Sequence, residues 1–179
     1  MILTLLVCFL IADFITGLVH WVEDTYGVKT WPWPLLDGVV LPNIEHHKNP
    51  TFIGTMSTLI SRNWHLVVPA VFVSLVFLYF GIWQVAVVLV LASLGNEVHA
   101  WNHRRTNNFA IAFLQDSGII QTPQQHAKHH KQPYDKYYCT LGNTVNAVLE
   151  LIGFWKGLEY LLSKIGIHPK RMTESRDWV

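Results

Sequence analysis

The sequence predicts an all-α, integral membrane protein with about three transmembrane helices, folded as a single domain over residues 1–179. Three observations predict this fold class. Charged residues make up only 14% of the chain and hydrophobic residues 51%, whereas an ordinary soluble domain has about 25% charged residues. The 34 residues from Asn63 to Asn96 contain no Asp, Glu, Lys or Arg. A second apolar segment covers Met1–Val22.

The first expected span covers residues 1–22. This segment lacks the basic region and the small-residue cleavage site of a secretory signal peptide. It also contains Asp13 and His20. We therefore expect a retained transmembrane helix, with a buried helix of a soluble core as the alternative.

The second and third expected spans form a helical hairpin. As one helix, the uncharged run would be about 51 Å long, which exceeds a hydrocarbon core of about 30 Å. Gly81-Ile82-Trp83-Gln84 lies near its middle and can turn the chain. We expect two spans at about 64–80 and 82–98, with Tyr79 and Trp83 anchoring the turn at the far interface.

The lysines and arginines orient these spans. Three of the 13, Lys29, Lys48 and Arg62, lie between the first and second spans, and the other ten follow from Arg104 onward. The positive-inside rule therefore places the loop 23–63 and the C-terminal part 99–179 in the cytoplasm and the N-terminus outside. Within the C-terminal part we expect an interfacial or half-buried helix over 107–120. An amphipathic helix over 141–165 is expected to lie on the membrane or to pack on the spans, and an ordinary amphipathic core helix fits its pattern equally well.

Histidine is the unusual residue of this chain, with ten copies against 12 acidic residues. Eight of them fall on the cytoplasmic side of the predicted topology: His20, His46, His47, His99, His103, His126, His129 and His130. His65 and His168 are isolated, and we assign them no role. Because the topology was derived from Lys and Arg alone, the convergence of eight histidines on one face is an independent observation.

The spacing of the eight histidines is typical of metal ligands. His99 and His103 are four residues apart, which places both on one face of a continuing helix. His126, His129 and His130 have the three-and-four spacing that directs side chains to one side of a helix. Eight imidazoles are too many for one ion. The sequence therefore predicts a histidine-rich site for two metal ions, carried by cytoplasmic or interfacial helices.

Acidic residues near these histidines are candidates for supporting roles. Asp13 and Asp24 share a helical stripe with His20, so either carboxylate could orient that imidazole. As outer partners or direct ligands we also consider Glu23, Glu45, Glu97 and Asp116. A solvated or capping role fits each acid equally well.

The composition narrows the chemistry of such a site. A zinc protease would need His-Glu-x-x-His, which the chain lacks. The clusters contain no cysteine, which argues against structural zinc and iron–sulfur sites. A net charge of +1 argues against nucleic-acid binding. A pair of irons held by nitrogen remains, and at the bilayer face it could use O2 to attack an unactivated C–H bond of a lipid.

These motifs are similar to those of the Kua/CarF-like lipid desaturase family, which includes plasmanylethanolamine desaturases. That family lies within the integral-membrane, histidine-box fatty acid desaturase and hydroxylase superfamily. The likeness runs from about Ala12 to Pro169. It is carried by ADFITGLVHW (12–21) with DTYG (24–27), EHHKNP (45–50), NEVHAWNH (96–103), LQD (114–116), HAKHHKQP (126–133), Tyr138-Cys139, Gly142, Asn146 and LELIGFW (149–155).

The resemblance implies an iron-dependent, O2-using desaturase that acts on a membrane lipid and receives electrons from an external protein of the cytochrome b5 or ferredoxin type. It also implies that the eight histidines are the iron ligands. The chain departs from some relatives at Gln125, where they have a further histidine. Alkyl and acyl chains both remain possible substrates.

Two other functions fit some of these features. A lipid or fatty acid hydroxylase would use the same two irons and would differ only in the fate of the substrate carbon. A non-enzymatic membrane metal transporter or sensor would need polar residues along its spans. The predicted hairpin offers only Ser74, Gln84 and Ser93.

Overall fold

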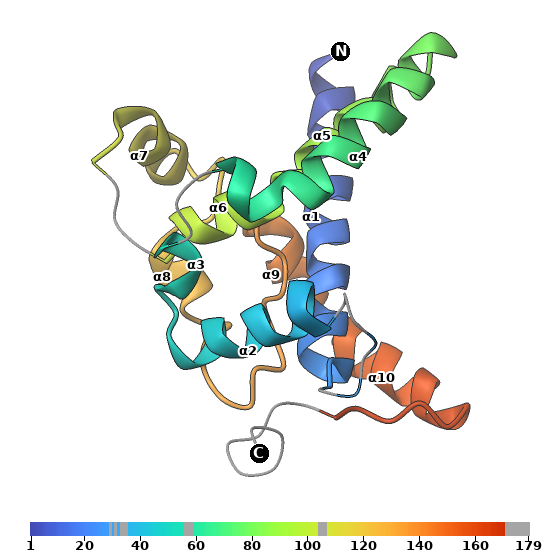
Figure 1. The fold of residues 1–179 in the computed structure, drawn as a ribbon, viewed down its shortest axis with the longest axis vertical. Helices are drawn as coiled ribbons and strands as arrows, with labels where there is room; N and C mark the ends of the chain where they lie inside the picture. Colours follow the sequence, from blue (N-terminus) through green and yellow to red (C-terminus); the bar gives the residue numbers. More distant parts are fainter. Residues whose placement is uncertain (29, 31, 33–35, 56–58, 104–106, 171–179) are drawn as a thin grey trace.

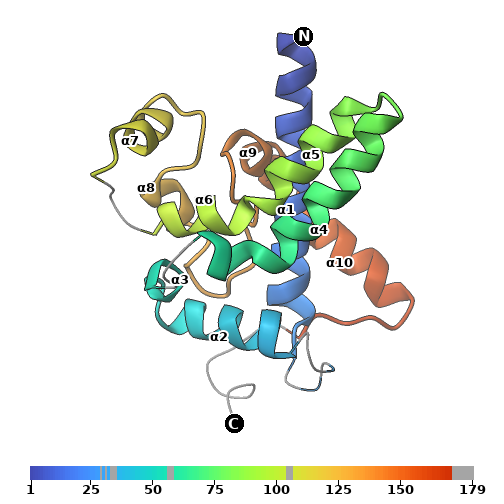
Figure 2. The same cartoon turned by 45° about the horizontal axis from the view of Figure 1, so that its top comes forward.

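A computed structural model describes residues 1–28, 30, 32, 36–55, 59–103 and 107–170. In this part of the chain every regular element is helical and no strand occurs, as the sequence predicted. Helix α1 runs through the molecule, and other helices pack along both of its halves, near Cys8 toward its start and near Trp21 toward its end (Figures 1 and 2).

Helix α1 (Ile2–Tyr26) has two different halves. Its N-terminal half exposes apolar side chains, including Ile2 at 83% and Leu3 at 72%. Its C-terminal half buries polar groups, among them Asp13, His20 and Asp24. Because the 25-residue helix is long and apolar enough to cross a bilayer, it is a candidate membrane span.

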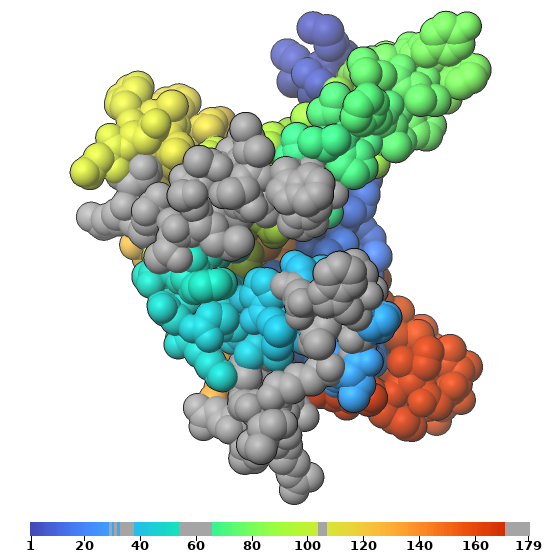
Figure 3. Space-filling view, in the orientation of Figure 1, coloured from blue at the N-terminus to red at the C-terminus, as the bar shows by residue number. Residues whose placement is uncertain are grey.

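Helices α4 (Leu59–Tyr79) and α5 (Trp83–Ser93) form the predicted hairpin and pack along each other. The turn falls at Gly81, whose φ of 74° lies in the left-handed region that glycine adopts without strain. In the space-filling view the hairpin and the start of α1 project from the rest of the molecule (Figure 3). The outer part of the hairpin exposes apolar side chains such as Phe72, Tyr79 and Phe80.

The third predicted span is not one straight helix. Helix α5 ends at Ser93, and α6 (Gly95–Trp101) continues at an angle of 42°. Gly95 allows α6 to pack closely on α1, since a Cβ atom there would lie 2.8 Å from Thr16 Cγ2. By length and composition α1 is one candidate span, and α5 with α6 is a second if the bent pair is taken as one. Three spans therefore stay a prediction.

Two further helix predictions were wrong in their extent. The segment 107–120 is helical only at α7 (Phe109–Asp116), which Asn108 caps through its side chain. The segment 141–165 is divided between α9 (Thr144–Leu151) and α10 (Phe154–Lys164). Gly153 separates these two helices with a φ of 62°, a conformation that interrupts a right-handed helix. The remaining described elements are η1 (Leu36–Val40), α2 (Leu41–Lys48), α3 (Phe52–Thr55) and α8 (Pro123–His126).

Two hydrophobic clusters hold the helices around α1. One contains Trp21, Tyr138 and Trp155 and joins the C-terminal half of α1 to α9 and α10. The other contains Ala12 and Val98 and joins α1 to α6.

Candidate metal centre

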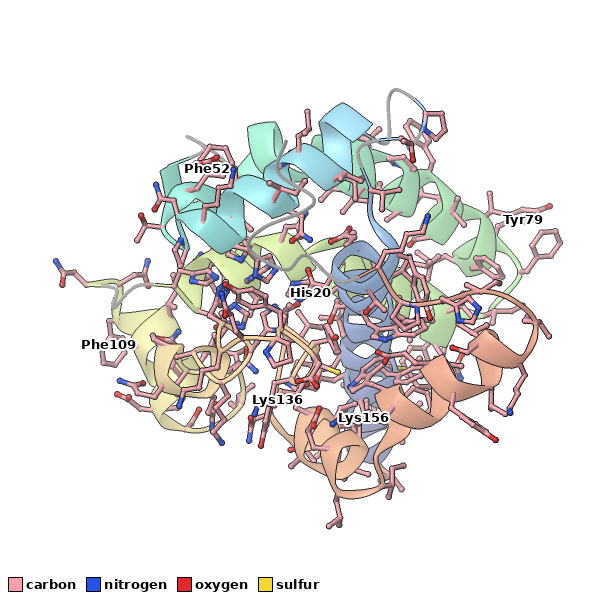
Figure 4. The ribbon with its side chains drawn as sticks, turned by 90° about the horizontal axis from the view of Figure 1, so that it is seen from below. His20, Phe52, Tyr79, Phe109, Lys136 and Lys156 are labelled. Carbon is pink, nitrogen blue, oxygen red and sulfur yellow. The ribbon has the colours of Figure 1, made fainter. Side chains whose placement is uncertain are left out.

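All eight histidines singled out in the sequence lie together in the structure. They come from α1, α2, α6 with the turn that follows it, and α8 with the turn that follows it. Figure 4 labels His20, which lies on α1 near the middle of this view. The eight residues form two adjacent groups, together with Asp24. His168 is exposed near the end of the described chain, and the side chain of His65 lies outside the described residues.

The first group consists only of histidines. Ring nitrogens from five of them lie within 4.8 Å of one another. Nε2 of His126 lies 2.9 Å from Nε2 of His103 and 3.2 Å from Nε2 of His130. Several lone pairs therefore point toward one small volume, which is the arrangement that a bound cation stabilises. We call this the five-histidine group: His46, His99, His103, His126 and His130.

The second group is centred on the carboxylate of Asp24. Its Oδ1 lies 2.9 Å from Nε2 of His47. Its Oδ2 lies 3.2 Å from Nε2 of His129 and 3.5 Å from Nε2 of His20. Asn43 donates a further hydrogen bond of 2.7 Å to Oδ1. We call this the Asp24 group: His20, Asp24, His47 and His129.

The two groups touch each other. The ring of His20 is 5.0 Å from that of His99, and the ring of His129 is 5.1 Å from that of His130, measured between centroids. His46 and His47 are neighbours in α2 and contribute one ring to each group. The arrangement therefore offers two neighbouring positions for cations within one buried centre.

The donor atoms test whether this site suits metal ions. Buried polar atoms are normally hydrogen-bonded, and exceptions need a reason. Here the atoms without a hydrogen-bond partner are concentrated at the two groups. At the two groups they are Nε2 of His20, His99 and His129, both ring nitrogens of His46, Nδ1 of His47 and His130, and Oδ2 of Asp24. Cations that bind one nitrogen of each ring would satisfy several of these atoms, so the residues present fit a two-metal site.

Three of the histidines are oriented by oxygen atoms that can only accept a hydrogen bond. Nδ1 of His20 lies 3.0 Å from the carbonyl oxygen of Tyr138, and Nδ1 of His129 lies 2.9 Å from that of Lys136. Nδ1 of His126 lies 3.0 Å from Oε1 of Gln121. Each Nδ1 therefore carries the proton and leaves Nε2 as the donor for a metal.

Burial keeps several imidazoles of the two groups neutral. Loss of hydration lowers the pKa of His103 to about 3, and repulsion from His129 and His47 adds to the effect. Burial likewise lowers the pKa of His46, His126 and His130 well below the ordinary value, and neighbouring histidines act in the same direction. At neutral pH the lone pairs are therefore available for coordination.

Three of the histidines lie in turns and not in the helices that the sequence predicted. His99 lies in α6, but the helix ends at Trp101, so His103 belongs to the following turn. His126 ends the short helix α8, and His129 and His130 lie in the turn beyond it. Reciprocal hydrogen bonds between Thr122 and Gln125 cap α8. The expectation of continuous helical faces was wrong, because turns rather than helices bring these rings together.

The loop after the last histidine box is fixed to α1. Oδ1 of Asp13 accepts hydrogen bonds of 2.9 and 3.1 Å from the backbone of Leu141 and Gly142. Gly17 lets this loop approach closely, since a Cβ atom there would clash with Sγ of Cys139. Asp13 thus holds the loop that supplies the carbonyl of Tyr138 to His20.

The other predicted acidic candidates lie apart from the ligand atoms of the two groups. Oε1 of Glu97 accepts a hydrogen bond of 2.9 Å from the indole of Trp101. Glu45 and Asp116 are exposed, and Glu23 is partly buried beside Asp24 in α1. Of the acids considered, Asp24 is the one whose carboxylate lies within a metal-compatible group.

Sequence reasoning missed the amides that support the site. Gln121 is fully buried and faces His126, while Nδ2 of Asn102 donates to Oε1 of Gln121 and to the carbonyl of Thr140. Asn43 supports Asp24. Asn102 lies inside a histidine box and could have been singled out from its position. Nothing in the local sequence distinguishes Gln121 from other glutamines.

This fold and site define an α-helical protein with a buried centre of two histidine-rich groups, each able to hold a metal ion, beside a helix long enough to span a membrane. A family model described as the lipid desaturase domain matches residues 9–172. The chain belongs to this family.

The individual relatives that the chain resembles are named as desaturases. The chain is 29% identical to "Plasmanylethanolamine desaturase" of Myxococcus xanthus over 91% of its length and 31% identical to "Plasmanylethanolamine desaturase 1" of Mus musculus over 86%. It is 27% identical to "Fatty acid desaturase 4, chloroplastic" of Arabidopsis thaliana over 96%. It spans 61%, 61% and 55% of these three proteins. No solved structure matches the chain.

Proposed function

We propose that this chain is a membrane-bound lipid desaturase that uses two irons and O2 to introduce a double bond into an alkyl or acyl chain. Membership of the lipid desaturase domain family supports this function. The observation that carries it is the gathering of eight histidines and Asp24 in two adjacent, largely buried groups, in which several nitrogen and oxygen atoms have no hydrogen-bond partner.

The donor set supports the choice of iron. Imidazole and carboxylate suit iron, and thiolates, which would favour zinc or a cluster, are absent from both groups. We assign all eight histidines as ligands, and the carboxylate of Asp24 would be a direct ligand in its own group. Irons bound there would supply, with O2 and electrons, the oxidising power needed to break unactivated C–H bonds.

The chain's own residues orient and shield this chemistry. The carbonyls of Tyr138 and Lys136 and the amide of Gln121 fix three imidazoles with Nε2 directed inward. His126 and His129 are fully buried, so solvent has little access to that side of the site. In the overall reaction each of two adjacent methylenes loses one hydrogen, and O2 takes up these hydrogens with two further electrons and two protons to form two molecules of water.

The apolar surfaces support delivery of the substrate from a bilayer. The N-terminal half of α1 and the α4–α5 hairpin expose apolar side chains and project from the same part of the molecule (Figure 3). The histidine centre lies at the opposite, C-terminal half of α1. We therefore place the centre at the cytoplasmic face, next to the acyl region, with the N-terminus outside.

An external redox protein of the cytochrome b5 or ferredoxin type would supply the electrons. Lys128 and Lys131 are exposed in the turn that carries His129 and His130. Lys48 is exposed directly after His47. These cations give an acidic redox protein a basic surface near the metal centre.

Expression of the chain in a host membrane, followed by mass spectrometry of the lipids, tests this function. We expect a lipid that has lost two hydrogens, and no such product from His99→Ala or His130→Ala. His168→Ala is the matched control, because that histidine is exposed and remote from the two groups. A product that has gained oxygen would identify a hydroxylase. Exchangeable zinc without iron would favour a transporter or sensor, and full activity of the two variants would overturn the ligand assignment.

A further inference from the structure

A continuous series of oxidisable aromatic rings leads away from the Asp24 group. The ring of Tyr138 is 5.4 Å from that of His129 and 6.0 Å from that of His20, measured between centroids. Tyr138 is 5.1 Å from Trp155, and Trp155 is 5.7 Å from Trp21. These distances correspond to rings in direct contact.

The series ends toward the surface. The ring of Tyr26, at the end of α1, lies 5.3 Å from that of Trp21. Tyr138, Trp155 and Trp21 are 0%, 2% and 3% exposed, whereas Tyr26 is only partly buried. We call these four residues the aromatic path.

We propose that the aromatic path carries oxidising equivalents from the metal centre to the protein surface when O2 reacts without a lipid in place. This inference depends on the proposed function, because the oxidant is the metal centre after reaction with O2. Tyrosine and tryptophan are the aromatic side chains that lose an electron most readily. Neither can be reduced at biological potentials, so the path transports oxidising equivalents outward and does not deliver electrons from a redox protein inward.

Oxidation of an aromatic ring makes its O–H or N–H proton acidic, so the hydrogen-bond partners along the path decide where a proton can leave. Tyr138 donates its phenolic proton to the carbonyl oxygen of Tyr134 at 2.9 Å. When an electron leaves Tyr138 for the oxidised centre, the phenol keeps this proton, because a carbonyl oxygen is too weak a base to take it, and Trp155 supplies the next electron from 5.1 Å away. The positive charge therefore moves on to the tryptophans and is neutralised at Trp21, where a carboxylate can accept a proton.

Trp21 also has a hydrogen-bond acceptor for its proton. Its indole nitrogen donates a hydrogen bond of 3.2 Å to Oε1 of Glu159, a buried carboxylate of α10. Once Trp21 has given an electron to Trp155, its N–H proton can move to Glu159. A small thiol or an ascorbate-like reductant in the aqueous phase then gives one electron to Trp21 by way of Tyr26 and is itself oxidised by one electron, while Glu159 returns the proton to the indole.

Phenylalanines in the same hydrophobic cluster show how the path differs from ordinary packing. Phe14 and Phe154 also contact Trp155, but their rings are not oxidised under these conditions. Tyr138→Phe keeps the ring and the backbone carbonyl that orients His20, but it also removes the hydrogen bond from the hydroxyl to Tyr134. Loss of that bond alone would speed iron release with or without O2, whereas loss of the aromatic path would speed it only in the presence of O2.

The test uses the full chain purified in detergent, loaded with iron, reduced, and exposed to O2 without lipid. Electron paramagnetic resonance of freeze-quenched samples detects tyrosyl and tryptophanyl radicals, peptide mass spectrometry locates oxidised residues, and iron analysis follows loss of the metal. We expect oxidation of the wild type at Tyr138, Trp155 and Trp21. Tyr138→Phe should lose the tyrosyl signal, accumulate oxidised histidine and release iron several-fold faster. Trp155→Phe should confine the radical to Tyr138.

Trp101→Phe is the matched control, because Trp101 is half-buried and packs in the other hydrophobic cluster. It should resemble the wild type in all three measurements. Equal rates of iron loss in the wild type and Tyr138→Phe, with oxidation spread over exposed residues, would overturn the aromatic path while O2 consumption continues. If the wild type neither retains iron nor consumes O2, the path and the proposed function both fail.

Discussion

Nδ1 of His126 lies 3.0 Å from Oε1 of Gln121, and both side chains are fully buried. The Gln121 amide is held in turn by a hydrogen bond of 3.1 Å from Nδ2 of Asn102. Because the amide oxygen only accepts, His126 carries its proton on Nδ1. Its Nε2 lone pair then points toward His103 and His130.

Gln121→Leu should weaken metal binding without unfolding the chain. Loss of a partner that orients a ligating histidine typically lowers metal affinity by about 10–100-fold. Gln121→Glu keeps an acceptor at the same position and should retain most of the affinity. Titration of iron(II) against a competing chelator measures the difference. Gln124→Leu makes the same chemical change at an exposed site, and equal affinities for the two leucine variants would contradict the role of Gln121.

Asp24→Asn should selectively empty the Asp24 group. The substitution keeps the shape of the side chain but removes the negative charge that lies 2.9 Å from His47 and 3.2 Å from His129. The five-histidine group does not include Asp24, so metal content per chain should be halved rather than abolished.

Elemental analysis of the purified variant, with circular dichroism to verify its helices, makes this measurement. Asp116→Asn is the control, since Asp116 is exposed at the end of α7. Wild-type metal content in Asp24→Asn would show that this carboxylate does not hold an ion.

The sequence could predict which histidines form the centre, because their spacing and the predicted topology pointed to the same eight residues. Spacing within each box indicated ligands, and the distribution of Lys and Arg placed all boxes on one side. The second group's carboxylate was harder to identify, since Asp13 and Asp24 share one stripe of α1 with His20. In the structure Asp24 faces three imidazoles, whereas Asp13 accepts hydrogen bonds from the loop backbone at Leu141 and Gly142.

The supporting contacts could not be predicted, because they depend on backbone positions far away in sequence. His20 is oriented by a carbonyl 118 residues later, at Tyr138. Helix ends were also inaccurate for a local reason. Hydrophobic periodicity continues through Leu94 and Gly153, yet the backbone turns at both positions. Periodicity reports which face is buried and not whether the helix is continuous.

Gly17→Ala should destabilise the protein, because the added methyl group would clash with Cys139 Sγ and lie 3.1 Å from the Cys139 backbone nitrogen. Overpacking of this kind costs about 1–3 kcal/mol. The displaced loop also carries the Tyr138 carbonyl, so metal affinity should fall together with stability.

Gly157→Ala is the matched comparison. A Cβ atom at Gly157 meets nothing within 4 Å, and the residue lies inside α10. Alanine favours the helix there, and the gain should be about 0.4–1 kcal/mol. Thermal unfolding in detergent compares the two variants with the wild type. A Gly17→Ala protein as stable as the Gly157→Ala protein would contradict the close packing of the loop on α1.

Iron should stabilise the folded chain strongly, because the site is assembled only when α1, α2, α6 and the α8 turn are packed together. A ligand that binds only the folded state adds about 2.7 kcal/mol when its concentration is roughly 100 times its Kd. For a protein of this size, each kcal/mol raises the Tm by roughly 2–4 °C. We therefore expect a rise of several degrees when iron(II) is added anaerobically and a matching fall after chelation.

Two variants test whether this rise in Tm comes from metal bound at the histidine centre. His99→Ala removes a ligand of the five-histidine group and should lose much of the rise in Tm, whereas His168→Ala, at an exposed position, should keep it. Differential scanning fluorimetry of the three proteins gives the comparison directly. Identical Tm values for iron-loaded and chelated wild-type protein would mean that the two groups hold no ion in the folded state, and their unpartnered nitrogen atoms would then need another explanation.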